Sequence, residues 1–395
     1  MRASCLIMII LAHNLYRSAS PSGENVAQER QCDLLSAAGI PVHSWTLASD
    51  VLASSSPINQ FLTAWHLAGS QARRKTFVTK LATLKREGAT VVHLHNPWPL
   101  FTYDIAVAAQ EVGLPIVQTL HNYRMISTNN RLVEAGCLRP SRNDAELLHL
   151  QRSANNHSWL ANPFYNRALD NLWKKRIPQT AVNSYVCLTS FQRRLLLAAG
   201  ISAERAVVIP NFLDHQGPIG HEPGDYALFV GRLDHTKGID RLMRWWPQHG
   251  PPLHIIGDGP LAGLVSGHPR IQSLGRLPFT EVQRKMAGAR FLVMASTWYE
   301  GLPLVLIEAL AAGTPCLVPD LGGMAEVIQD GITGVVFLPN DDVRAADAVQ
   351  RLWDGAPTMR PACRRAYETQ FTPQQHLKSL LMLYQSVKPP PKPIF

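Results

Sequence analysis

The segment ASTWYEGLPLVLIEALAAGTP, residues 295–315, predicts the end of a strand, a turn and a short helix. Pro303 suits the first helical position, and Gly313 suits the residue just past the helix end. The helix is apolar except for Glu308, and a lone carboxylate is costly to bury without a partner. We therefore expect the helix to pack into a core on most sides, with Glu308 at an edge and Glu300 in the turn before it.

Both carboxylates would then flank a helix N-terminus, whose free N–H groups and dipole favour an anion. A buried helix with a capping Glu is the alternative. The segment resembles the signature of retaining glycosyltransferases of the GT-B fold, in particular glycosyltransferase family 4. This resemblance implies that Glu300 contacts the donor sugar and that Glu308 contacts the ribose of the nucleotide.

Length and composition indicate a folded chain of two or three domains. The 395 residues are 46% hydrophobic and 17% charged, which excludes a disordered protein. The six cysteines form no C-x-x-C pair, so we expect reduced thiols in the cytoplasm and no zinc site or disulfide framework. The apolar run Cys5–Ala12 is too short to span a bilayer, and we expect it to form a first buried strand, with a weak signal peptide as the alternative.

The net charge of +9 is concentrated in the N-terminal half. Residues 1–200 hold 20 Lys and Arg against 11 Asp and Glu, whereas residues 201–395 hold 18 of each. Such a surface attracts anions, or it only aids solubility. A basic, amphipathic helix is expected from about Phe61 to Glu87, where it could lie on anionic lipid or dock as a surface helix. Without a recognisable module, nucleic-acid binding is not expected.

Strand-like and helix-like runs alternate, which predicts an α/β architecture with parallel sheets. A first strand over Cys5–Leu11 leads into a polar loop with Gly23, which would let the backbone approach a phosphate or sugar. Two later strands end in His95-Asn96 and His121-Asn122, and strand ends on one side of a parallel sheet meet at one crevice. The runs VVHLHNPWPL and LPIVQTLHNYR resemble the same family, which implies that His121 hydrogen-bonds the donor sugar.

A second motif, GRLDHTKG, follows the strand predicted at Tyr226–Val230. Arg232 and Lys237 are two cations five residues apart at a strand-to-helix junction, an arrangement suited to a diphosphate. Surface decoration is the alternative. The resemblance extends to this Gly-Arg…Lys-Gly pattern and implies that both cations bind the donor diphosphate.

The resemblance implies a GT-B fold, in which two Rossmann-like, doubly wound domains face each other across a cleft. We expect residues 1–210 to form an acceptor-side domain, residues 211–372 to form the nucleotide-sugar donor domain, and the helix in residues 373–395 to cross back to the first domain. The N–H groups of Leu304 and Val305 would bind the leaving diphosphate. The resemblance also implies that Leu277 lies in a loop that touches the nucleobase, and Gly301 is a further expected substrate-binding residue.

The expected reaction moves a sugar from a nucleotide-diphosphate sugar to an acceptor hydroxyl with retention of configuration, in bacterial cell-surface polysaccharide or glycolipid synthesis. No Asp-x-Asp pair occurs in the sequence, so we expect neither a metal nor another cofactor. The acceptor would be a sugar or a lipid-linked sugar, reached in the cytoplasm or at the inner face of the membrane. A nucleotide-sugar epimerase of the same fold and a catalytically silent sugar-nucleotide-binding scaffold are the alternatives; a phosphorylase would be longer and carry a pyridoxal lysine motif.

Overall fold

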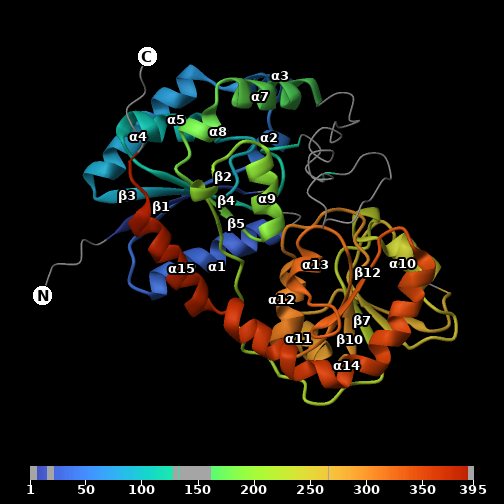
Figure 1. Ribbon diagram of the computed structural model, residues 1–395. Helices are drawn as coiled ribbons and strands as arrows, with labels where there is room; N and C mark the ends of the chain where they lie inside the picture. The colour runs from blue at the N-terminus through green and yellow to red at the C-terminus, as the bar shows by residue number, and fades with distance from the viewer. Residues whose placement is uncertain (1–6, 16–21, 128–131, 133–161, 266, 390–395) are drawn as a thin grey trace, which may run out of the picture.

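The fold consists of two α/β lobes, each built on a parallel six-stranded sheet (Figure 1). The computed structural model describes residues 7–15, 22–127, 132, 162–265 and 267–389. The strand order is β2-β1-β3-β4-β5-β6 in the first sheet and β12-β11-β10-β7-β8-β9 in the second. In both sheets the chain first adds strands on one side of its starting strand and then adds the remaining strands on the other side, so both lobes are doubly wound. The two-lobe α/β architecture predicted from the sequence is confirmed.

The strands of the first sheet are β1 (Met8–Leu15), β2 (Val42–Ala48), β3 (Ala89–Leu94), β4 (Ile116–Leu120), β5 (Ser184–Cys187) and β6 (Ala206–Val208). The first lobe carries the helices α1 (Gly23–Ala37), α2 (Asp50–Ala53), α3 (Pro57–Trp65), η1 (His66–Ala68), α4 (Gln71–Arg86), α5 (Asp104–Val112), α7 (Asn162–Lys174), α8 (Ile177–Thr180), α9 (Ser190–Ala198) and η2 (Ala203–Arg205).

The strands of the second sheet are β7 (Ala227–Val230), β8 (Leu253–Ile256), β9 (Ile271–Gly275), β10 (Phe291–Val293), β11 (Cys316–Pro319) and β12 (Gly334–Phe337). The helices along this part of the chain are η3 (His235–Lys237), α10 (Ile239–Trp245), η4 (Ala262–Val265), α11 (Phe279–Gly288), α12 (Leu304–Ala311), α13 (Met324–Val327), α14 (Asp342–Gln370) and α15 (Pro373–Ser386).

Apolar clusters cover both faces of the first sheet, because successive residues of a strand point to opposite sides. Ile10 of β1 belongs to the cluster that also contains the buried faces of α4 and α5. Its neighbour Ile9 belongs to a different cluster, where it packs with Leu380 and Tyr384 of α15. The last helix of the chain therefore packs on the first lobe, beside α1 (Figure 1).

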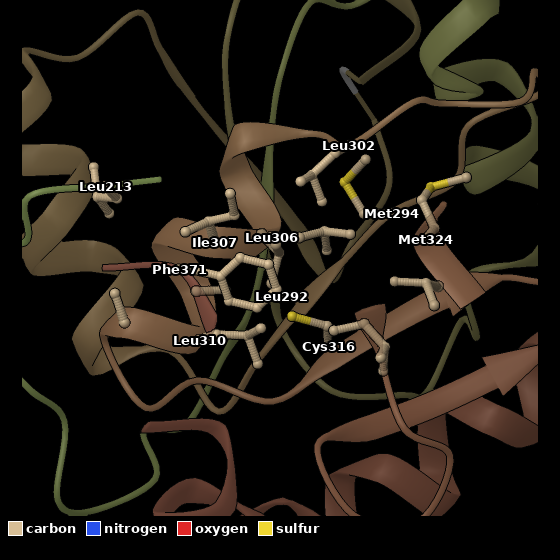
Figure 2. Packing of buried hydrophobic residues seen from close by; sticks show 14 of the residues in the cluster. Leu213, Leu292, Met294, Leu302, Leu306, Ile307, Leu310, Cys316, Met324 and Phe371 are labelled. Carbon is tan, nitrogen blue, oxygen red and sulfur yellow. The ribbon is translucent and has the colours of Figure 1, made fainter. Parts of the chain in front are cut away.

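Helix α12 forms the centre of the second lobe's core, as its apolar sequence predicts. Leu306, Ile307 and Leu310 have no exposed surface, and they pack in the same cluster as Leu292 of β10 and Cys316 of β11 (Figure 2). Burying a leucine or isoleucine side chain contributes roughly 1.5–3 kcal/mol. This packing fixes α12 against the sheet and thereby fixes the position of its N-terminus.

Three expected element boundaries are wrong. Strand β1 continues through the buried residues His13 and Asn14 to Leu15, where the side chains of His13 and Asn14 hydrogen-bond to Asn25 and Ser49. Pro303 is extended and precedes α12, so it caps the helix instead of starting it. The helix expected over residues 61–87 is broken after η1, where the positive φ of a glycine and the N-cap Ser70 start a new helix.

The two lobes contact each other through apolar packing and hydrogen bonds. The ring of Phe191 on α9 stacks on Tyr299 with centroids 5.8 Å apart. The Glu326 carboxylate of the second lobe accepts hydrogen bonds from the backbone N–H groups of Ser190 and Phe191, at 2.5 and 2.8 Å. The Tyr123 hydroxyl donates to the backbone oxygen of Glu300 at 3.2 Å. Glu326 thus supplies a negative charge to the N-terminus of α9 across the lobe boundary.

Candidate active site

A cavity of about 510 Å³ lies between the lobes and is lined by both. Its walls follow the carboxyl ends of β4 and β7, where open α/β sheets bind ligands. Nine of the ten residues predicted to form the site line this cavity: Gly23, His121, Arg232, Lys237, Glu300, Gly301, Leu304, Val305 and Glu308. The tenth, Leu277, is outside this lining and packs, half-buried, against the cluster that contains α12.

Glu300 is the most constrained side chain of the site. Its Oε1 accepts hydrogen bonds from Lys237 Nζ at 2.6 Å, Trp298 Nε1 at 2.7 Å and Ser296 Oγ at 2.9 Å. The residue is only 7% exposed. In the described part of the chain, all of these donors reach the same oxygen, so Oε2 is left for a ligand. Neither Ser296 nor Trp298 was predicted, although they and Glu300 occupy alternate positions of the segment between β10 and α12.

The ion pair between Lys237 and Glu300 was also not predicted. The sequence suggested separate roles for the two residues, one at the diphosphate and one at the sugar. An ammonium group has three N–H donors, and one of them reaches Glu300. The pair therefore orients Lys237 and still leaves donors for a second partner.

The loop that carries Lys237 is held in place by Asp234 and Gly238. Asp234 accepts hydrogen bonds from the backbone N–H of Lys237 at 3.0 Å and from the Thr236 hydroxyl at 2.6 Å. Burial would raise the pKa of Asp234, but these hydrogen bonds and the charge of Arg232 outweigh burial and lower it. Gly238 has φ +68°, and a Cβ there would lie 1.8 Å from the backbone oxygen of Ala295, so only glycine fits.

Arg232 is the most exposed cation of the site. Its guanidinium is paired with Asp234 at 2.6 Å, yet 65% of the side chain remains accessible. Lys237, by contrast, is 23% exposed. Arg232 therefore lies where the cavity opens to solvent, and solvent screens its charge more strongly than that of Lys237.

The N-terminus of α12 opens into the cavity between Glu300 and Glu308. Leu304 and Val305 are the first two helical residues, whose N–H groups have no acceptor within the helix. Glu308, one turn later, has a raised pKa because burial disfavours its charge, and the positive charge of Arg30 on α1 opposes this shift. Arg30 was not predicted as a site residue, since it comes from the opposite lobe and no motif surrounds it.

The first lobe contributes a stack of histidines, of which His95 is buried and His121 is half-buried at the cleft. His95 Nδ1 and His121 Nε2 lie 2.8 Å apart, and the two rings stack with centroids separated by 5.1 Å. The predicted meeting of these two strand ends is therefore confirmed. His93 stacks on the other side of His95 at 4.6 Å, and His13 lies edge-on to it at 6.1 Å.

Burial keeps these imidazoles neutral. Desolvation lowers the pKa of His121 to about 3, with a smaller effect from His13. It likewise lowers the pKa of His93 to about 3 and holds that of His95 well below 6.5. His13 and His93 were not predicted, but His13 lies near the carboxyl end of β1, next to β3, so the same strand-end reasoning could have found it.

Two kinds of structure are absent from the described residues. No helix there is long and apolar enough to cross a bilayer. No group of three or more His, Cys, Asp or Glu side chains there is arranged to hold a metal ion.

Among curated proteins, the chain is similar to an exopolysaccharide phosphotransferase of Streptomyces coelicolor, with 32% identity over 48% of this chain but only 21% of that protein. It is also similar to a glycogen synthase of Mycobacterium tuberculosis, with 28% identity over 88% of this chain and 78% of that one. Among solved structures, HepE of Anabaena in complex with UDP has a TM-score of 0.64 at 15% identity, covering 96% of this chain and all of that one. The last similarity shows the fold.

Two families match most of the sequence in succession. Residues 29–216 match Glycosyltransferase Family 4, and residues 224–355 match Glycosyl transferases group 1. The first match covers most of the first lobe, including His93, His95 and His121, and the second covers Arg232, Lys237, Glu300 and Glu308. The chain therefore belongs to the GT-B glycosyltransferases that combine these two domains.

Proposed function

We propose that this protein transfers a sugar from a nucleotide-diphosphate sugar to an acceptor hydroxyl with retention of anomeric configuration. The observation that carries the proposal is the position of Glu300, which has one oxygen fixed by three donors and lies inside a cavity shared by both lobes. The similarity to HepE, which was solved with UDP and with UDP-glucose, supports a nucleotide-sugar donor.

The second lobe holds the donor in this mechanism. Lys237, Arg232 and the N–H groups of Leu304 and Val305 bind the diphosphate and stabilise the negative charge that develops on it as the glycosidic bond breaks. Because these groups carry that charge, the transfer proceeds without a divalent metal or another cofactor. Glu308 accepts hydrogen bonds from the ribose hydroxyls.

The sugar lies between Glu300 and His121. Oε2 of Glu300 accepts hydrogen bonds from sugar hydroxyls, while His121 contacts the sugar from the first lobe. Positive charge develops on the anomeric carbon in the transition state, and an imidazolium there would oppose it. The low pKa of His121 keeps the ring neutral at pH 7 and so avoids this repulsion.

Retention follows from attack on the face that the diphosphate leaves. The leaving diphosphate accepts the proton of the acceptor hydroxyl as the new bond forms, so no enzyme nucleophile takes part. Closure of the lobes around the bound donor would exclude water and so suppress hydrolysis of the donor.

The proposed acceptor is a sugar or a lipid-linked sugar of a cell-surface polysaccharide or glycolipid, used in the cytoplasm or at the inner membrane face. The apolar residues Phe77 and Leu81 of α4 are buried in the core of the first lobe, so the membrane contact expected from residues 61–87 cannot be made by α4. Helix α3 instead exposes Ile58, Phe61, Leu62 and Trp65, which are spaced as one helical face. This face is the proposed contact with anionic lipid.

The test is an assay of purified protein with a panel of nucleotide sugars, with and without candidate acceptors, in the presence and absence of EDTA. We expect nucleotide release that depends on an acceptor and survives EDTA, with a product whose anomeric configuration by NMR matches the donor. Interconversion of donor sugars without an acceptor would instead identify an epimerase. Binding of a donor without turnover under any of these conditions would identify a silent scaffold.

A further inference from the structure

A second cavity, of about 190 Å³, lies within the first lobe. It is bounded by the connection from η1 to α4, the connection from β3 to α5, and helices α7 and α8. The polar side chains in its wall include Arg74, Trp98, Asp104 and Lys175. None of these residues has a part in the donor site described above.

Two N–H donors at this cavity have no hydrogen-bond partner in the described part of the chain. Trp98 is only 4% exposed, and its indole Nε1 is unpaired. The Nε of Arg74 is also buried and unpaired. Leaving a buried donor unsatisfied costs about 1–3 kcal/mol. Because the two residues that carry these donors line the cavity, a ligand there that brings acceptor oxygens within their reach would offset this cost.

The charge at the cavity favours an anion. Asp104 is its buried carboxylate, but it is already neutralised by Arg73 at 2.7 Å and by the backbone N–H of Ser70 at 2.8 Å. Arg74 Nη2 lies 3.7 Å from Asp104 and is not needed to balance it, and Lys175 adds a further positive charge. The N-terminus of the 16-residue helix α4, at Gln71, also lines the cavity and directs its dipole there.

A small third cavity, of about 10 Å³, lies between this cavity and the active site. Trp98 and Tyr103 line both the second and the third cavities, while His121 and Asn122 line both the third cavity and the cleft between the lobes. The three cavities thus follow the carboxyl edge of the first sheet. A ligand that extends along this edge could place a hydroxyl near His121 and an anionic group near Arg74.

We propose that the second cavity binds a phosphate or diphosphate group of the acceptor, through ion pairs with Arg74 and Lys175 and hydrogen bonds from Trp98 Nε1 and the N-terminus of α4. This inference rests on the proposed transferase function, because it names the acceptor class of the same enzyme. The exposed apolar face of α3 adjoins the cavity through η1 and α7, so a lipid carrying the phosphate could lie there, as could a soluble sugar phosphate in the cavity alone.

The test measures binding of inorganic pyrophosphate by calorimetry to the full-length protein and to variants at the two sites. Arg74→Gln combined with Lys175→Gln should weaken the second-cavity binding at least tenfold, and Lys237→Gln should remove only the binding at the donor cavity. Trp98→Phe, which keeps the packing and deletes the N–H, should weaken the second-cavity binding a few fold. Lys174→Gln, an exposed neighbour on α7 outside the lining, is the matched control and should change neither.

A second arm identifies the source of the phosphate. Sedimentation with vesicles containing a polyprenyl phosphate in phosphatidylcholine, compared with phosphatidylcholine alone, should depend on Arg74 and Lys175 if the acceptor is lipid-linked. Pyrophosphate binding that depends on both residues, without vesicle binding, would assign a soluble phosphorylated acceptor to the same cavity. If neither pyrophosphate binding nor vesicle binding is affected by the combined Arg74→Gln and Lys175→Gln substitutions, the proposal is wrong. If the nucleotide-sugar donor binds equally well to the Lys237→Gln variant, the proposed donor site is wrong, but the proposal for the second cavity still stands.

Discussion

The two walls of the cleft differ in how they handle charge. On the second lobe, Lys237, Glu300 and Arg232 form ion pairs, next to an open helix end. On the first lobe, His121 lines the cleft and His95 lies behind it, and burial lowers the pKa values of both so far that they stay neutral. In the proposed reaction, the charged wall faces the departing diphosphate and the neutral wall faces the sugar, which becomes positive.

The largest effect is expected at Glu300, where charge and geometry are both specified. Glu300→Gln keeps the shape but removes the charge and weakens the bond from Lys237, so kcat should fall by about 100-fold or more. Steady-state assays of transfer measure this, and Glu281→Gln, on α11 outside the cavity lining, is the control. Activity within threefold of the native protein would remove Glu300 from the site.

The two cations of the charged wall should differ from each other. Lys237→Ala removes a half-buried charge next to the proposed diphosphate and should weaken donor use by about 10- to 100-fold. Arg232→Ala should have a smaller effect, because 65% of that side chain is exposed to solvent. Comparing kcat/KM for the donor in the two variants checks the order, and a reversed order would show that Arg232 is the main diphosphate ligand.

The neutral wall can be tested at His95, which contacts His121 but does not line the cleft. His95→Ala should lower kcat about tenfold, because His121 loses the partner that fixes its ring and tautomer. His95→Asn should restore part of the activity, since its amide group can occupy the place of Nδ1. Equal losses in both variants, in proportion to lost thermal stability, would reveal a packing role only.

The neutral state of the histidines also predicts a pH-dependent stability. A histidine whose folded pKa is lowered stabilises the protein above its unfolded pKa, near 6.5, and this stability is lost as the pH falls towards the folded value near 3. At pH 5.5, each such histidine should cost about 1.4 kcal/mol of unfolding free energy. Thermal unfolding followed between pH 7.5 and 5 should show this decline, and His376→Gln should make it shallower. A melting temperature independent of pH would contradict neutral burial.

The smallest effect is expected at the contact between the lobes away from the cleft. Glu326→Ala removes the carboxylate that caps α9 and should lower the unfolding free energy by about 1 kcal/mol. Glu368→Ala, which loses only an exposed pair with Arg364, is the matched control. Equal melting temperatures for the two variants would show that the cap contributes nothing to the joining of the lobes.

The elements and most of the site could be predicted because both depend on local patterns. Glycines and prolines bounded α12, and strand ends brought His95 and His121 together. The break between η1 and α4 at Gly69-Ser70 could also have been predicted, because a glycine followed by an N-cap serine is a local signal. We instead expected one continuous amphipathic helix there.

What could not be predicted depends on side chains meeting across elements. The Lys237–Glu300 pair joins residues 63 positions apart, and it forms because the segments that follow β7 and β10 lie beside each other, which no local pattern specifies. Arg30 approaches Glu308 only because the lobes are packed together. Leu277 was placed by resemblance alone, and its contact with the nucleobase remains a prediction.

A crystal structure of the protein with a bound nucleotide sugar would test the proposed donor site. We predict the diphosphate within about 3 Å of Lys237 Nζ and of the N–H groups of Leu304 and Val305, with the ribose at Glu308 and the sugar between Glu300 and His121. A nucleotide bound outside this cleft, or a diphosphate that contacts the first lobe alone, would contradict it.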